Sequence, residues 1–262
     1  MTPAPSTDHT APGELPDPTD ALSAVPVAGS RRAAPVVGHL RFYYGPMDCG
    51  KSTLALQVDH NHARQGRRGL LLVHLDRSGL PQITSRIGIT RQAIEVHGHV
   101  DLRALVRAHW AAGQRVDYLI VDEAQFLTPE QVDQLAVLAD DSQVDVYCFG
   151  IATDFRSRLF PGAARLFELA DELQPVQVDV LCWCGAPARF NARVVDGRIT
   201  RDGDTVVVAD TETTRSMTES NHSSGQLDTS STTVRYQVLC RRHFRLGDLG
   251  ADVAVQGQLS FA

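Results

Sequence analysis

The chain contains the sequence Gly45-Pro46-Met47-Asp48-Cys49-Gly50-Lys51-Ser52-Thr53, which has the form G-x-x-x-x-G-K-S of a phosphate-binding loop. The preceding run, Leu40 to Tyr44, is apolar and aromatic enough to form a β-strand. The following run, Leu54 to Arg64, has helical spacing and contains neither proline nor glycine. In a strand, loop and helix of this order, backbone N–H groups of the loop and of the helix N-terminus bind an anion.

Lys51 is the only lysine in the chain, and the other 24 of the 25 basic residues are arginine. A lysine is retained where a compact ammonium is needed to reach the β- and γ-phosphates of a nucleotide. Ser52 is then expected to bind magnesium. A chance match in a glycine-rich turn is the alternative, and the flanking elements and the single lysine disfavour it.

Composition limits the classes of protein to consider. The 262 residues are 43% hydrophobic, which suffices for one sizeable core. A net charge of −6 and a pI near 5.9 argue against duplex nucleic acid as a partner. No apolar run approaches the ~20 residues of a membrane span, and no secretory signal is evident. The odd number of cysteines, five, favours a reducing cytoplasm with free or metal-bound thiols.

Composition also divides the chain. Residues 1–36 are rich in proline and polar residues and are expected to be a disordered tail. A nucleotide-binding domain is predicted over 37–175 and a zinc-binding domain over 176–248. The zinc-binding domain contains a Thr/Ser-rich insertion at about 210–233, which is either a mobile lid or a disordered segment. Residues 249–262 are expected to form a C-terminal tail.

Two further apolar strands end in charged residues. Leu70 to Leu75 is followed by Asp76 and Arg77, which are either magnesium-side and phosphate-side groups or an ordinary surface ion pair. Val116 to Val121 is followed by Asp122 and Glu123, as in a Walker B strand. Since successive side chains at a strand end point to opposite faces, one of these acids can hold magnesium while the other acts as a general base. For Glu123 the alternative is a solvated charge.

The predicted fold is therefore α/β, a RecA-like parallel sheet flanked by helices, with a small C-terminal zinc domain. Phe155, Arg156 and Phe160 lie in the segment 151–162, which either contacts a flat substrate and phosphate or forms an arginine-rich surface loop. The remaining predicted elements are helices over 101–112, from Thr128 and over 163–173, and strands over 144–150, 176–181, 198–209 and 234–239.

Four metal-ligand residues occur in two close pairs. Cys182 and Cys184 form the first pair, and Cys240 and His243 form the second. Three thiolates and an imidazole match the ligand set of a structural zinc site. Buried thiols with a surface histidine are the alternative.

Together these motifs resemble the type II thymidine kinases, the cytosolic class with a P-loop and zinc, and in particular their actinobacterial branch. The resemblance covers roughly residues 38 to 247 and is carried by five groups of residues: Gly-Pro-Met with Gly50-Lys51-Ser52; Asp122-Glu123-Ala124-Gln125-Phe126; Asp154-Phe155-Arg156 to Phe160; Cys-Trp-Cys-Gly with Cys-Arg-Arg-His; and Tyr236-x-x-x-Cys240.

The resemblance implies a role for each matching residue. Glu123 would be the catalytic base and Lys51 the second catalytic residue. The nucleotide and magnesium would be bound by Gly45, Pro46, Met47, Asp48, Cys49, Gly50, Lys51, Ser52, Thr53, Asp76, Arg77, Asp122, Glu123, Ala124 and Gln125. The nucleoside would be bound by Met47, Phe126, Phe155, Arg156, Phe160, Asn191 and Tyr236, with Asn191 where the family usually has threonine.

The resemblance also implies the reaction: transfer of the γ-phosphoryl group of ATP to the 5′-hydroxyl of thymidine, with Mg²⁺ and a structural Zn²⁺. Feedback inhibition by dTTP and a homotetramer are further properties of the family. Two alternatives are another P-loop NTPase, such as a RecA-like motor, and a non-enzymatic nucleotide-sensing or zinc-ribbon module. Asp48 departs from the family pattern and adds negative charge near the triphosphate unless it turns outward.

Overall fold

The computed structural model describes residues 37–74, 81–203 and 234–250, and these all belong to one compact unit of the chain. Outside the described residues lie the predicted tail 1–36, Asp76 and Arg77, residues 204–209 of the predicted strand 198–209, the insertion 210–233, and residues 251–262 of the predicted C-terminal tail. Within the described residues, no helix combines the length and apolar character needed to cross a bilayer.

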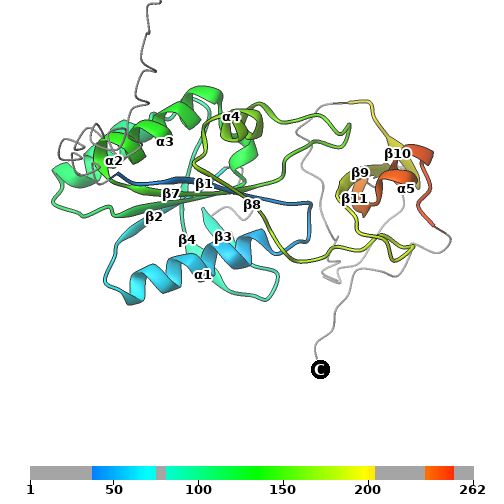
Figure 1. Cartoon of the computed structure of the whole chain (residues 1–262), viewed down its shortest axis with the longest axis horizontal. Coiled ribbons are helices and arrows are strands. Elements are labelled where there is room, and N and C mark those ends of the chain that lie inside the picture. The colour runs from blue at the N-terminus through cyan, green and yellow to red at the C-terminus, as the bar shows by residue number, and fades with distance from the viewer. Residues whose placement is uncertain (1–36, 75–80, 204–233, 251–262) are drawn as a thin grey trace, which may run out of the picture. The chain divides into compact units, whose positions relative to one another are not determined.

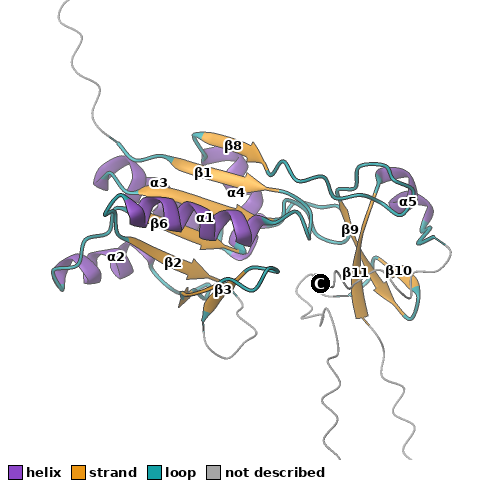
Figure 2. Ribbon diagram, turned by 90° about the horizontal axis from the view of Figure 1, so that it is seen from below, coloured by secondary structure: helices purple, strands orange, loops and turns teal. Residues whose placement is uncertain are grey.

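The larger of the sheets confirms the predicted α/β fold. Its six strands have the order β5-β2-β6-β7-β1-β8, and every neighbouring pair is parallel. The strands are β1 (Leu40–Tyr44), β2 (Gly69–Val73), β5 (Ile94–Glu95), β6 (Tyr118–Asp122), β7 (Asp145–Gly150) and β8 (Glu172–Pro175). All five residues of β6 are buried, as expected for a strand covered on both faces. Figure 2 shows β1, β2 and β8 running in the same direction.

Helices cover both faces of this sheet (Figure 1). Helix α1 (Lys51–Arg64) lies on one face, and α2 (Leu102–Ala111), α3 (Pro129–Ser142) and α4 (Pro161–Leu169) lie on the other. The predicted starts of α2 and α3 are confirmed. Asp101 caps α2 by accepting a hydrogen bond from Ala104 N (2.9 Å), and Thr128 forms a capping box with Gln131 at the start of α3.

A second, smaller sheet follows. It is antiparallel, in the order β10-β9-β11, and consists of β9 (Phe190–Val195), β10 (Arg198–Thr200) and β11 (Val234–Leu239). The short helix α5 (Arg241–Leu246) comes after β11. A separate hydrophobic cluster includes Cys182, Leu239 and Phe244. A hairpin of β3 (Gln82–Thr84) and β4 (Thr90–Gln92) lies between β2 and β5 in the chain.

Two local predictions are wrong, and two strands were missed. The helix predicted to reach Leu173 ends at Leu169, because the next residues pair with β1 as the edge strand β8. The strand predicted over 176–181 does not form, although its valines alternate. Val178 is largely exposed and only an isolated bridge joins Leu181 to Pro187, so no neighbouring strand supports it. Strands β3 and β9 were not predicted from the sequence.

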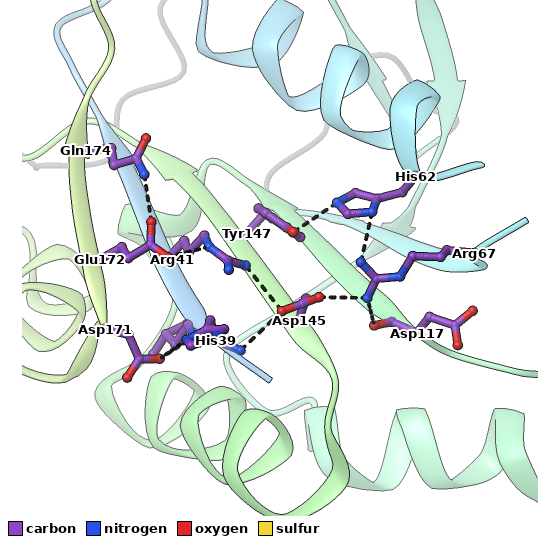
Figure 3. Close-up of polar contacts among 11 residues, drawn as sticks. His39, Arg41, His62, Arg67, Asp117, Asp145, Tyr147, Asp171, Glu172 and Gln174 are labelled. Atoms are coloured by element: carbon purple, nitrogen blue, oxygen red, sulfur yellow. Dashed lines mark hydrogen bonds and ion pairs between the residues drawn. The ribbon is translucent and has the colours of Figure 1, made fainter. Parts of the chain in front are cut away.

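A polar network connects α1 to the amino end of the sheet (Figure 3). Asp145 accepts hydrogen bonds from Arg41 (3.2 Å) and Arg67 (2.7 Å). Arg67 also donates to His62 Nδ1 (2.9 Å). Since an arginine only donates, His62 Nδ1 is unprotonated and Nε2–H donates to the Tyr147 hydroxyl (2.9 Å). Burial and the nearby Arg67 charge lower the pKa of His62.

We expect Gly69→Ala to destabilise the protein. A Cβ at this position would lie 2.1 Å from Cε2 of Tyr118, a buried residue whose hydroxyl donates to Asp59 Oδ1 (2.8 Å). Displacing the ring is expected to lower the free energy of unfolding by about 1–3 kcal/mol. Thermal unfolding measures this as a lower Tm. Gly98→Ala is the control, because its Cβ would meet only Thr128 Cγ2 at 3.5 Å. Equal Tm values for the two variants would contradict this account of Gly69.

We expect His62→Gln to reduce the loss of stability in acid. The folded pKa of His62 is lowered, so its contribution to stability is complete above its unfolded pKa of about 6.5 and is lost as the pH falls below it. Glutamine cannot titrate but can accept from Arg67 and donate to Tyr147. Between about pH 7.5 and 5.5, the Tm of the variant should fall less than that of wild type. His60→Gln, at an exposed position of α1, should retain the wild-type slope.

Candidate active site

The loop that follows β1 has the geometry of a phosphate-binding loop. Gly50 lies immediately before α1 with a φ of 81°, a left-handed conformation that glycine adopts without strain. Gly45 N donates to Gly150 O (3.3 Å), which fixes the start of the loop against the end of β7. The loop therefore occupies the carboxyl edge of the sheet, where parallel α/β folds bind ligands.

Lys51 is folded back over this loop. Its ammonium group donates to Pro46 O (2.7 Å) and Gly45 O (3.3 Å), and the side chain is buried. Cys49 Sγ lies 3.8 Å from the same nitrogen. These carbonyl oxygens hold the positive charge beside the loop amides, so a bound phosphate would meet the ammonium and the N–H groups together.

Asp122 lies at the end of β6, close to the start of α1. It is buried, accepts a hydrogen bond from Glu123 N (3.0 Å) and lies near the Ser52 hydroxyl. Burial and the charge of Glu123 raise the pKa of Asp122 to about 6, although Ser52 and Lys51 act in the opposite direction. The carboxylate and hydroxyl oxygens of Asp122 and Ser52 are ligand types that Mg²⁺ prefers, so these two residues fit a magnesium ion.

Glu123 has a left-handed backbone (φ 54°) and is held by Gln125. Gln125 Nε2 donates to Glu123 Oε2 (2.5 Å), while Gln125 Oε1 accepts from Ile151 N (3.1 Å). Because Ile151 N–H can only donate, it fixes the orientation of the Gln125 amide. Gly150 leaves room for this amide, since a Cβ there would lie 2.7 Å from Gln125 Oε1.

Aromatic side chains gather next to these acids. Phe126 packs against the edge of Phe160, with ring centroids 5.4 Å apart. It also contacts His74, the residue after β2, with ring centroids 5.5 Å apart. His74 Nδ1 is buried without a hydrogen-bond partner among the described residues. Two of the predicted aromatic residues, Phe126 and Phe160, are thus in contact. His74 joins them, although the sequence analysis did not identify it.

Phe155 is buried, and two guanidinium groups lie close to its ring. Arg156 lies 4.9 Å from the ring centroid and Arg193 lies 5.1 Å from it. Asp154 shapes the loop by accepting from Arg156 N and Arg158 N, both at 2.9 Å. The Arg156 side chain donates to Arg201 O (3.0 Å) and to Gly203 O. The Arg156 side chain is thus bonded to carbonyl groups of the segment that follows β10.

The small sheet directs one face toward these loops. Asn191 accepts a hydrogen bond from Met47 N (2.9 Å). Arg193 lies two residues further along β9, and Tyr236 is directly opposite Arg193 on β11. Side chains at these positions share a face of the sheet. Asn191 and Tyr236 were predicted; Arg193 was missed, although its spacing of two from Asn191 would have placed it on the same face once a strand was recognised.

Asp48 turns away from the loop. Its side chain is exposed and forms an ion pair with Arg86, in the turn between β3 and β4. Asp48 therefore turns outward, as the sequence analysis required if its charge is not to oppose triphosphate binding. Arg86 offsets the charge of Asp48. Asp76 and Arg77, the remaining predicted nucleotide-binding residues, lie outside the described residues.

The predicted ligand residues form one cluster. The ligand atoms of Cys182, Cys184, Cys240 and His243 all lie within 4.8 Å of one another. His243 Nδ1 is 3.4 Å from Cys182 Sγ and 3.5 Å from Cys240 Sγ. Trp183 stacks on the His243 ring, with centroids 4.2 Å apart. Three sulfurs and one imidazole nitrogen at these separations fit a tetrahedral zinc ion.

The chain is similar to known proteins over most of its length. The family model described as "Thymidine kinase" matches residues 38–244. A thymidine kinase of Streptomyces coelicolor is 50% identical over 206 residues, which cover 79% of this chain and 88% of the relative. One from Streptomyces avermitilis is 47% identical with the same coverage. One from Cutibacterium acnes is 47% identical over 214 residues, or 82% of this chain and 91% of the relative. The chain therefore belongs to the thymidine kinase family, as its sequence motifs predicted.

Proposed function

We propose that this chain is an ATP-dependent kinase that phosphorylates the 5′-hydroxyl of thymidine, with deoxyuridine as a second possible acceptor. The observation that carries the proposal is the Glu123 carboxylate. It lies beside the Walker B residue Asp122 and accepts a hydrogen bond from Gln125. An oriented carboxylate next to a phosphate-binding loop suits transfer to a hydroxyl group.

The triphosphate would occupy the loop Gly45 to Thr53. Lys51 would exchange its contacts with Gly45 O and Pro46 O for phosphate oxygens. Ser52 and Asp122 would hold Mg²⁺, which neutralises phosphate charge when it is bound. Because Asp122 must be ionised for this role, its raised pKa favours magnesium binding above about pH 6.

The acceptor hydroxyl would lie against Glu123. Its carboxylate would orient the 5′-hydroxyl and remove the proton as the new P–O bond forms. Gln125 would keep the carboxylate directed at the acceptor, because its own orientation is fixed by Ile151 N. Most of the rate enhancement would come from positioning and charge neutralisation.

The nucleoside would be enclosed by the surrounding apolar and aromatic groups. Met47 and the rings of Phe126, Phe155 and Phe160 would surround the base, and Tyr236 would contact the nucleoside from β11. Asn191 would border this space next to Met47. Arg156 would support it by holding the main chain at Arg201 and Gly203.

The metal cluster would hold one structural zinc ion and take no part in chemistry. We further propose the division into a nucleotide-binding domain, 37–175, and a zinc domain, 176–248. By resemblance to the family we also propose inhibition by dTTP, a homotetrameric state and a cytoplasmic location. Each of these can be tested separately from the kinase activity.

We expect Glu123→Gln to lower kcat at least ~100-fold, the usual scale for loss of a general base. The amide retains the shape of the side chain but cannot take the proton. Kinetics with thymidine, ATP and magnesium measure the effect, and ATP binding measured by calorimetry should be retained. Glu130→Gln, at an exposed position of α3, is the control with wild-type kcat. Near-normal turnover in Glu123→Gln would refute the base assignment.

We expect freshly purified protein to contain about one zinc ion per chain by elemental analysis. Cys182→Ser should lose most of this zinc and lower the Tm, because a ligand to the metal is removed. Cys148→Ala changes a buried cysteine of β7 outside the cluster and should keep the metal. Absence of zinc from the wild-type protein would rule out this ligand set.

A further inference from the structure

One hydrogen bond links the small sheet to the phosphate-binding loop. Asn191 of β9 is buried, and its Oδ1 accepts from Met47 N at 2.9 Å. The two residues are 144 positions apart in the chain. A backbone N–H can only donate, so Asn191 must present its oxygen to Met47. The amide of a loop residue is thus held by a side chain of the small sheet.

A second contact holds the same face of β9. Arg193 lies over one side of Phe155, at 5.1 Å, and Arg156 lies 4.9 Å from the same ring. Arg156 in turn donates to Arg201 O at 3.0 Å. The face of β9 that carries Asn191 is therefore fixed against two loops at the carboxyl edge of the large sheet.

The metal cluster sets the position of β9. Phe190, adjacent to Asn191, pairs with Leu239, and the residue after Leu239 is the ligand Cys240. Phe190 also stacks on Phe244, with ring centroids 5.0 Å apart, and Phe244 follows the ligand His243. The ligands Cys240 and His243 are thus direct neighbours in the chain of Leu239 and Phe244, the two residues that contact Phe190 at the start of β9.

We propose that Asn191 is a positioning residue that couples the metal cluster to the phosphate-binding loop. With metal bound, β9 presents Asn191 to Met47 N–H and holds the entrance of the loop in the conformation that receives the triphosphate. Without metal, β9 shifts, the hydrogen bond is lost, and nucleotide binding weakens. The inference rests on the proposed zinc and nucleotide sites, but the contact itself can be observed without either ligand.

The amide of Met47 reports on this contact directly. The chain has three methionines, Met1, Met47 and Met217, so ¹⁵N-methionine labelling gives a nearly empty amide spectrum. The Met47 resonance is identified by its loss in Met47→Leu. In Asn191→Leu we expect it to move upfield and its hydrogen exchange to accelerate about 5–10-fold, the scale of one lost hydrogen bond. Asn191→Asp, which keeps the acceptor oxygen, should restore the wild-type position.

The coupling is tested by removing zinc. Stripping zinc from the wild-type protein with a chelator should move the Met47 resonance in the direction seen in Asn191→Leu. Stripping zinc from Asn191→Leu should move it no further. Asn61→Leu changes an exposed asparagine of α1 that accepts a hydrogen bond from Gln57, and its Met47 resonance should respond to zinc as in wild type.

Nucleotide binding is the functional measurement. We expect Asn191→Leu to retain its zinc and to raise the Kd for ATP about 5–10-fold by calorimetry. An unchanged Met47 resonance in Asn191→Leu overturns the proposed contact. An equal zinc response in Asn191→Leu and wild type overturns the coupling. Neither measurement requires kinase activity, so a failure of the proposed reaction would be recognised separately.

Discussion

The parallel arrangement of β6, β7 and β1 is the constraint on which the site depends. Because these adjacent strands run in one direction, the groups that follow them meet at one edge of the sheet. Gly45 follows β1 and bonds to Gly150 at the end of β7, while Asp122 ends β6 beside Ser52. Segments separated by about a hundred positions thus form one site without a long loop having to reach across the molecule.

The polar groups of this site are held in pairs whose orientation is set by backbone N–H donors. Gln125 has one end fixed by Ile151 N and the other bonded to Glu123. Asn191 is fixed in the same way by Met47 N. A side-chain amide bonded to a backbone donor cannot turn over without losing that bond, so each one presents a defined atom to its surroundings. The site is therefore largely organised before any substrate binds, which lowers the cost of reorganisation during reaction.

Much of the nucleotide-binding half could be predicted, because its signals are local. The phosphate-binding loop, the acids after β6 and the caps at Asp101 and Thr128 each depend on neighbouring residues. The metal cluster also followed from ligand type and spacing. β9 and Arg193 could not be predicted in this way. Their strand pairs with β11 across some forty positions, and the valines of 176–181 gave a stronger but misleading alternation. Long-range pairing decides such elements, and one sequence does not display it.

The almost exclusive use of arginine as the basic residue affects the charge of the whole molecular surface. Lys51 is the only lysine, and it is buried against Pro46 O and Gly45 O. Reagents that attach to side-chain amines therefore have one target in the chain, inside the nucleotide loop, and an occupied loop would shield it. The other 24 basic residues keep their protons in any ordinary buffer. The positive charge on this protein's surface is accordingly insensitive to alkaline solutions that would neutralise a lysine-rich one.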